Sequence, residues 1–128
     1  MGVRIVRLGS PRASGEGTRI GTVRRPPRGV PKSQFSTRNW YDVWFPMLAP
    51  SLQTMKLGRQ AVTSSQWAIF VGKYKTEMAK SDAKRAIELL TALSHTANFS
   101  VGCYCEDEER CHRSVLRKLL IENRAKVV

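Results

Sequence analysis

Three thiols and an imidazole lie within ten residues of one another: Cys103, Cys105, Cys111 and His112. The thiolate is the nucleophilic form of cysteine, and a nearby histidine, arginine or helix N-terminus lowers the pKa of the thiol. Cys111 is followed directly by His112 and Arg113, so all of these conditions are met at one turn. The sequence does not decide whether the chain is an enzyme. For an enzyme, we predict Cys105 or Cys111 as the nucleophile and His112 as the acid–base catalyst.

The same turn leads into a predicted helix, and the start of a helix attracts anions. Its first backbone N–H groups have no partner within the helix, and an arginine offers a two-pronged donor to a phosphate or carboxylate. We therefore predict Arg113 and Ser114 as ligand-binding residues. The familiar phosphatase loop is excluded, because it needs an arginine six positions after its cysteine, and that position after Cys105 is Cys111. The acidic residues 106–109 would weaken an anion site unless their side chains point away.

The same thiols and imidazole are also the groups that bind zinc. Structural zinc takes four thiolate or imidazole ligands in a tetrahedron, usually in pairs two to four residues apart. The pair Cys103 and Cys105 is tighter than this, and four ligands from ten residues would strain the strand that they border. We predict no metal and no cofactor, and a zinc-stapled interaction domain is kept as an alternative. A third interpretation is that the thiols are buried beside a polar helix cap, Cys103 being a small buried hydrophobic residue.

A second group of candidate residues lies in the basic loop 24–32. Three prolines in this segment remove backbone donors and fix φ, so it is neither a helix nor a central strand. Arg24, Arg25 and Arg28 are predicted to bind a ligand. The whole chain has 22 Lys and Arg against 10 Asp and Glu, a net charge of +12. Such a charge favours phosphate-bearing ligands or nucleic acid, although it also promotes solubility alone.

An aromatic-rich, irregular stretch follows the basic loop and carries four rings: Trp40, Tyr41, Trp44 and Phe45. One interpretation is a stacking surface for nucleobases beside the arginines. The other is a hydrophobic plug that closes the core over a long connection, which we favour because Leu48 and other apolar side chains accompany the rings.

The hydrophobic pattern predicts the elements that position these residues. Alternating β-rich segments predict strands at 3–8, 18–23 and 99–104. Apolar residues at helical spacing predict helices at about 64–79, with Ser64 or Ser65 as cap, at about 82–96, with Ser81 or Asp82 as cap, and at about 111–124. We expect one α/β domain over residues 1–128, a two-layer or three-layer sandwich with a small, largely parallel sheet.

Two classes of protein are excluded by composition. No apolar run approaches the ~18–20 residues that span a bilayer, so we expect no membrane association. Three cysteines clustered within nine residues do not make a disulfide framework, which indicates the reducing cytoplasm. The oligomeric state stays open.

Several motifs carry a resemblance that spans essentially the whole chain. They are Arg-Ile-Gly-Thr-Val-Arg-Arg-Pro-Pro-Arg-Gly-Val-Pro-Lys at 19–32, Trp-Tyr-Asp-Val-Trp-Phe-Pro at 40–46, Leu-Ala-Pro-Ser at 48–51, Tyr74 to Met78, Cys-Tyr-Cys-Glu-Asp at 103–107 and Cys-His-Arg-Ser at 111–114. Together they resemble the domain-of-unknown-function 488 family. The resemblance implies a small single α/β domain of bacterial and archaeal type, without an established reaction. It also implies that Arg24, Arg25 and Arg28 match the family's arginine loop and that 111–113 match its closing Cys-His-Arg.

These observations lead to one hypothesis and two alternatives. The hypothesis is that a phosphate-bearing ligand, a nucleotide or nucleic acid, binds between the basic loop 24–32 and the turn 105–114, with thiolate chemistry as a further option. The first alternative is a non-catalytic nucleic-acid-binding module that uses the aromatic stretch. The second is the zinc-stapled interaction domain.

Overall fold

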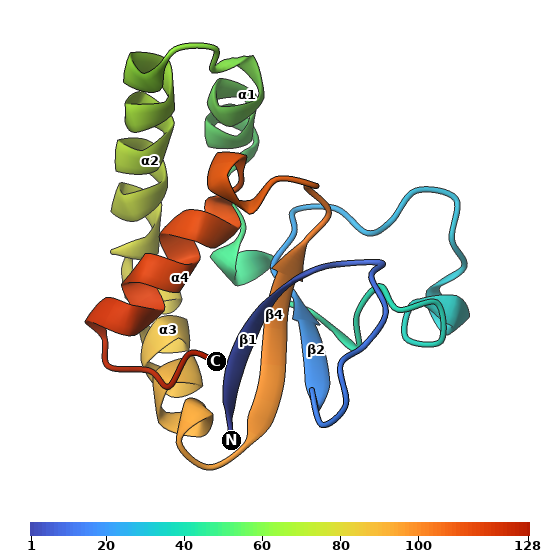
Figure 1. The fold of residues 1–128 in the computed structure, drawn as a ribbon. Helices are drawn as coiled ribbons and strands as arrows, with labels where there is room; N and C mark the ends of the chain where they lie inside the picture. Colours follow the sequence, from blue (N-terminus) through green and yellow to red (C-terminus); the bar gives the residue numbers. More distant parts are fainter.

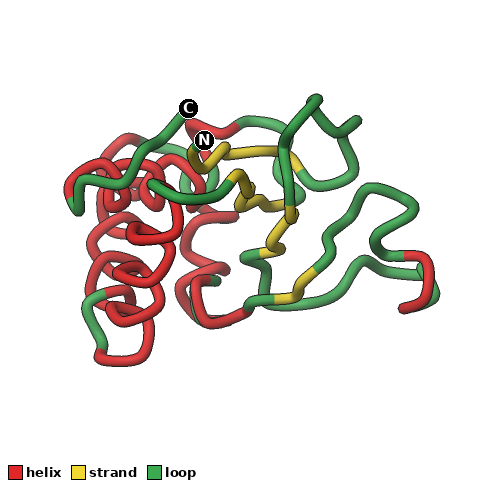
Figure 2. Tube along the Cα trace, turned by 90° about the horizontal axis from the view of Figure 1, so that it is seen from below, coloured by secondary structure: helices red, strands yellow, loops and turns green.

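A computed structural model describes all 128 residues, and its centre is a four-stranded parallel sheet. Spatial order across the sheet is β1-β4-β2-β3, so β4, the last strand in the chain, lies between the first two. Figure 1 shows the helices gathered on one side of the sheet, and Figure 2 shows long loops on the other side. The predicted α/β class and parallel sheet are confirmed.

Three of the four strands agree with the predicted segments to within two residues at each end. The four strands are β1 (Gly2–Arg7), β2 (Thr18–Gly21), β3 (Val43–Trp44) and β4 (Asn98–Cys103). In register, Val101 of β4 lies between Ile5 of β1 and Ile20 of β2. A Cβ on Gly102 would stand 2.7 Å from the Leu8 side chain, so glycine is needed for the close approach at this end of the sheet. Strand β3 has only two residues, and the sequence pattern did not predict it.

Four helices follow in the order α1 (Leu52–Gln60), α2 (Ser64–Met78), α3 (Ser81–Ser94) and α4 (His112–Glu122). The caps predicted for two of them are wrong. Thr63, not Ser64 or Ser65, caps α2, and it forms a capping box with Gln66. At α3 the cap position is Lys80, whose side chain makes no capping hydrogen bond. Helix α1 was not predicted.

The main core lies between the sheet and the helices. Its buried members include the stripe predicted for α2, with Phe70, Tyr74 and Met78 packed against Val101 and Leu116. A second, smaller cluster lies where the chain leaves β1, β2 and β4. It is formed by Leu8, Val23, Tyr41, Cys103 and Cys111. Because Tyr41 belongs to this cluster, the interpretation of the aromatic stretch as a hydrophobic plug is confirmed for that ring.

The carboxyl ends of β1, β2 and β4 lie at one edge of the sheet, as parallel strands require. The loop that contains Arg24 leaves β2 there, and the thiol-bearing turn leaves β4 beside it. In open α/β folds, ligands bind in the crevice outside this edge. None of the four helices combines the length and the apolar content that crossing a bilayer requires.

Candidate anion-binding cavity above a thiol cluster

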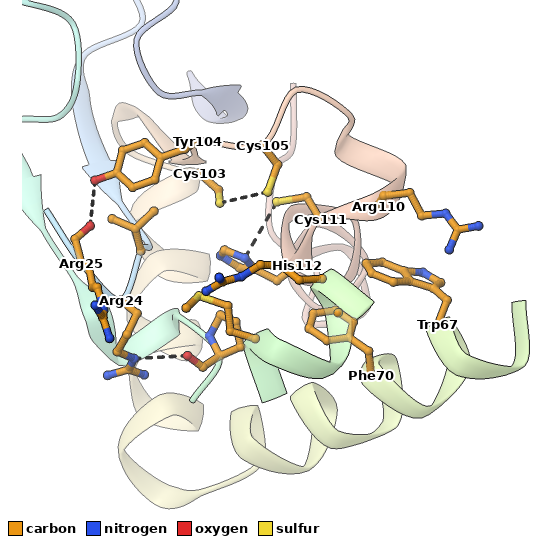
Figure 3. Close-up of a pocket in the computed structure, with 15 residues that line it drawn as sticks. Arg24, Arg25, Trp67, Phe70, Cys103, Tyr104, Cys105, Arg110, Cys111 and His112 are labelled. Carbon is orange, nitrogen blue, oxygen red and sulfur yellow. Dashed lines mark hydrogen bonds between the residues drawn. The ribbon is translucent and has the colours of Figure 1, made fainter. Parts of the chain in front are cut away.

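A cavity of about 340 Å³ opens at the carboxyl edge of the sheet. The lining comes from the loop after β2, from α1 and α2, and from the turn between β4 and α4. It consists of Val23, Arg24, Arg25, Pro50, Met55, Gly58, Arg59, Trp67, Phe70, Cys103, Tyr104, Cys105, Arg110, Cys111 and His112. Figure 3 shows the sulfur atoms and the imidazole at its centre. The volume falls within the range of small-molecule sites.

The sulfur atoms and the imidazole of this cavity form one cluster. The donor atoms of Cys103, Cys111 and His112 all lie within 4.8 Å of one another, and all three residues are buried. The Sγ of Cys105, two residues beyond the end of β4, lies 3.8 Å from the Sγ of Cys103. Cys105 is the exposed member. All three cysteines are free thiols.

The orientation of His112 follows from its hydrogen bond to β2. Its Nε2 lies 2.8 Å from the backbone carbonyl oxygen of Thr22, which can only accept, so Nε2 carries a proton and donates. The other ring nitrogen, Nδ1, lies 3.8 Å from the Sγ of Cys111. The ring also packs edge-on against Tyr74, with a distance of 5.4 Å between ring centroids. Nδ1 is therefore the nitrogen that faces the thiols.

The thiols affect one another's ionisation. Hydrogen bonds from Cys103 and Cys111 lower the pKa of Cys105 to about 3, and the charge of Arg113 acts in the same direction. The pKa of Cys111 is also lowered, chiefly by its hydrogen bond with Cys103. The pKa of Cys103 is raised, because its proton is shared with the sulfur atoms of Cys105 and Cys111. Ionisation is thus favoured at Cys105 and Cys111 over Cys103.

Two of the three predicted loop arginines line this cavity. Arg24 donates to the carbonyl oxygens of Ala49 and Pro50, at 3.0 and 3.2 Å, so its guanidinium also fixes the segment before α1. Arg25 is exposed, and its carbonyl oxygen accepts a 2.8 Å hydrogen bond from the hydroxyl of Tyr104. Figure 3 shows this bond joining the loop to the turn after β4. The structure therefore brings together the two distant segments that the sequence pointed to.

The other predicted ligand residues have different surroundings. Arg28 lies in a separate hollow beside Trp40 and Tyr104. Arg113 is 3 % exposed; its Nη2 donates to the carbonyl oxygen of Cys105 at 2.6 Å, and its Nε has no partner. The amide and the hydroxyl of Ser114 both bond to the carbonyl oxygen of Cys111. None of these three side chains lines the cavity above the thiols.

Sequence reasoning missed several residues that line the cavity. Arg59 lies on α1, the helix that was not predicted, and Trp67 and Phe70 lie on α2, which was predicted as a helix but not as part of a site. Their rings stack at 4.6 Å between centroids. Arg110 lies over Trp67, with its guanidinium carbon 5.6 Å from the ring centroid. Arg110 follows four acidic residues in the sequence, so its part in the basic and aromatic lining of the cavity was not predicted.

The acidic residues of this turn do not line the cavity. Glu108 accepts two hydrogen bonds from Arg117 of α4, at 2.6 and 2.8 Å, and this ion pair lowers its pKa. Glu106 lies 3.5 Å from Arg7 on the surface, and Asp107 accepts a hydrogen bond from a backbone amide of its own turn. The condition stated for an anion site, that these side chains point away, is met.

Comparison with known proteins identifies the family of the chain but no individual relative. A family model named DUF488-N3a, described as the active DUF488-N3 subclade, matches residues 3–124. No curated protein matches the chain. No solved structure matches it either.

Proposed function

The chain belongs to the DUF488-N3a family, and we propose that it binds a phosphate-bearing ligand with a flat apolar part, such as a nucleotide, in the cavity above the thiols. One observation carries the proposal: four arginines and three aromatic side chains line this cavity, and no carboxylate does. Arginine offers planar, paired donors that match a phosphate group.

The four arginines of the lining outnumber its two acidic thiols, Cys105 and Cys111, and none of them is paired with a carboxylate. Arg25, Arg59 and Arg110 are exposed, and none of them forms an ion pair. Like charges that face one cavity repel one another, and an anion bound between them removes that repulsion. A multiply charged phosphate satisfies several of these guanidinium groups at once.

The apolar part of the ligand is accommodated by α1 and α2. Trp67 and Phe70 provide stacked rings, and Met55 and Pro50 extend the apolar surface. A nucleobase gains from stacking on such rings, by about 1–3 kcal/mol per base. The proposal therefore specifies a ligand that carries both a phosphate and a flat ring.

The nucleophile remains a prediction within this proposal. Of the two candidates, Cys111 is buried and Cys105 is exposed, and both line the cavity. Cys105 is therefore the thiol that a ligand reaches first. Alkylation of Cys105 by iodoacetamide tests its reactivity.

The proposal is tested by titrating the full chain with a nucleoside, the corresponding nucleoside monophosphate and inorganic phosphate, with binding measured by calorimetry. The monophosphate is expected to bind more tightly than either of its two parts. The double variant Arg25→Gln/Arg110→Gln should bind the monophosphate at least about tenfold more weakly, since a hydrogen bond to a charged group contributes about 1.5–3 kcal/mol.

The matched control is Arg38→Gln/Lys73→Gln, which removes the same charge from exposed positions outside the cavity. It should leave the affinity within about twofold, since exposed charges have small long-range effects in salt. Equal losses in the two double variants would show that binding follows net charge alone. That result, or a nucleoside that binds as tightly as its monophosphate, would overturn the proposal and favour the non-catalytic nucleic-acid-binding module.

A further inference from the structure

Within the thiol cluster, two pairs of donor atoms have the spacing that a tetrahedral metal imposes on its ligands. With zinc–sulfur bonds of about 2.3 Å and zinc–nitrogen bonds of about 2.0–2.1 Å, neighbouring ligand atoms stand about 3.6–3.8 Å apart. The distances from Cys103 Sγ to Cys105 Sγ and from Cys111 Sγ to His112 Nδ1 are both 3.8 Å. The close spacing of Cys103 and Cys105 in the sequence was the argument against a metal site. In the folded turn their sulfur atoms are as far apart as two zinc ligands, so this argument no longer holds.

The histidine is held as a metal ligand requires. A histidine that binds a metal through one ring nitrogen usually donates the N–H of the other to a fixed acceptor, which sets its tautomer and orientation. His112 does this by donating from Nε2 to the carbonyl oxygen of Thr22 at 2.8 Å. The hydroxyl of Thr22 is itself held by the carbonyl oxygen of Gly102, at 3.0 Å. The lone pair of Nδ1 is left free on the side of the sulfur atoms.

A buried positive charge beside the cluster is the second, independent observation. Arg113 is 3 % exposed, forms no ion pair, and leaves its Nε without a hydrogen-bond partner. An unpaired buried charge is costly unless a negative charge lies nearby. Three thiolates and one neutral imidazole around a divalent cation have a net charge of −1, which balances Arg113.

We propose that Cys103, Cys105, Cys111 and His112 bind one zinc-type divalent cation at the floor of the cavity. The three buried ligands hold the ion within the fold, and Cys105 closes the coordination from the side of the cavity. The site goes beyond the proposed binding of a phosphate-bearing ligand and does not depend on it, but a Cys105 that holds the ion is not available as the nucleophile. It joins the turn after β4 to the start of α4, which fixes the wall that carries Tyr104 and Arg110.

The test uses the full chain without a histidine tag, stripped with a strong chelator and then reloaded with Zn²⁺. Elemental analysis is expected to find about one zinc per chain, as one four-ligand site requires. Reloading with Co²⁺ is expected to give thiolate-to-cobalt absorption. Cys105→Ser should lower that absorption by about one third, the loss of one thiolate in three, and weaken metal binding. His95→Gln, which changes the other histidine, should leave both measurements unchanged.

Alkylation separates the metal site from a cluster of free thiols. With zinc bound, iodoacetamide should label Cys105 at least about tenfold more slowly than in the stripped protein, because a coordinated thiolate is blocked. Cys105 is exposed, so Cys105→Ser is expected to fold, and circular dichroism checks this. The inference is overturned if the reloaded chain holds no zinc, if Cys105 is labelled equally fast with and without zinc, or if folded Cys105→Ser keeps the affinity and the cobalt spectrum.

These measurements are made without any nucleotide. The variant Arg25→Gln/Arg110→Gln keeps all four proposed ligands and should still bind one zinc. Loss of nucleotide binding with zinc retained, or the reverse, therefore shows which of the two proposals fails.

Discussion

The buried ion pair between Glu16 and Arg19 joins the loop before β2 to the centre of the sheet. Arg19 is fully buried and donates to both carboxylate oxygens of Glu16, at 2.8 and 3.0 Å. It also donates to the carbonyl oxygens of Ser10 and Asn39, and Ser100 of β4 donates to Glu16 at 2.7 Å. Nearly every polar atom of the pair is satisfied, which is the condition under which a buried pair is tolerated.

This pair predicts how stability depends on pH. Burial opposes the ionisation of Glu16, but hydrogen bonds from Arg19 and Ser100 outweigh it and lower the pKa from 4.5 to about 2. Because the folded pKa lies below the unfolded one, the stabilisation is complete above pH 4.5 and is lost as the pH falls toward 2. It amounts to about 3 kcal/mol.

Urea unfolding of the native chain and of Glu16→Gln across pH 2 to 7 measures this contribution. The variant should be less stable by about 3 kcal/mol at pH 7, because Arg19 loses its partner, and the two curves should converge toward pH 2. Asp42, Glu77 and Glu108 also have lowered pKa values, so both proteins will lose stability in acid. The difference between the curves is therefore the relevant quantity, and parallel curves would contradict the prediction.

At the residue scale, sequence reasoning predicts contacts that are local in the chain. The alternation of an extended segment predicts that Cys103 and Cys105 share a side, and their Sγ atoms lie 3.8 Å apart although β4 itself ends at Cys103. The same reasoning does not find the pair of Glu16 and Arg19. A charged residue in a strand is expected to face water, and the partners that make burial tolerable come from three other segments, at Ser10, Asn39 and Ser100. The unpaired Nε of Arg113 was hidden for the same reason.

Helices α1 and α2 form one wall of the cavity, and the sequence did not predict this wall. The carboxylate of Glu77 on α2 accepts hydrogen bonds from the hydroxyls of Ser51 and Thr54, at 2.6 and 2.7 Å. Ser51 in turn caps α1 by accepting from the amide of Thr54. Gly58 then lies against the ring of Phe70, where a Cβ would stand 2.8 Å from a ring carbon.

Two glycine-to-alanine variants test this packing. In an open helical site, alanine stabilises by about 0.5–1 kcal/mol relative to glycine, and Gly72 of α2 has nothing within 4 Å of an added Cβ. At Gly58 the ring of Phe70 is stacked on Trp67 and cannot move freely. Gly58→Ala should therefore destabilise the protein by about 1–3 kcal/mol, the usual cost of overpacking.

Thermal and urea unfolding measure both variants. Opposite signs are expected, with Gly72→Ala above the native chain in stability and Gly58→Ala below it. If Gly58→Ala is as stable as Gly72→Ala, the close contact between α1 and Phe70 does not exist in solution, and the wall of the cavity is misplaced.

Helix α2 could be predicted and α1 could not, for a physical reason. Phe70, Tyr74 and Met78 of α2 repeat at helical spacing and are all buried. In α1 the apolar residues Leu52 and Leu57 are exposed, and the helix is held by its cap and by Glu77. A helix held by polar contacts to a distant residue has no apolar stripe for the sequence to reveal. Arg59 was missed with it.

For the whole molecule, the sequence predicts the parallel sheet and the edge at which the site lies. Strands separated by helical segments require crossover connections, and these place the ends of β2 and β4 together. The path of the 24–42 connection was not predictable, because prolines and irregular turns carry no periodic pattern. The structure shows that this path brings Arg25 to the site and carries Arg28 away from it.

Binding in the cavity and general attraction of polyanions to the positive surface are expected to depend differently on salt concentration. A net charge of +12 attracts any polyanion, and that attraction weakens steeply with salt as counterions are released. A single-stranded oligonucleotide that makes about six phosphate contacts should bind about 300-fold more weakly at 200 mM than at 50 mM salt. A nucleoside monophosphate in the cavity meets only a few arginines and is partly shielded from solvent. Its affinity should fall only about two- to fivefold over the same range.

Fluorescence titration at these two salt concentrations measures both slopes on the same preparation. Arg25→Gln/Arg110→Gln should remove most monophosphate binding and leave the oligonucleotide slope nearly unchanged, because that slope depends on charges over the whole surface. Arg38→Gln/Lys73→Gln should lower the oligonucleotide slope by at most about one unit and leave monophosphate binding in place. A monophosphate whose affinity falls as steeply as that of the oligonucleotide would show that it binds the outer surface. The arginine-lined cavity would then not be the site of recognition.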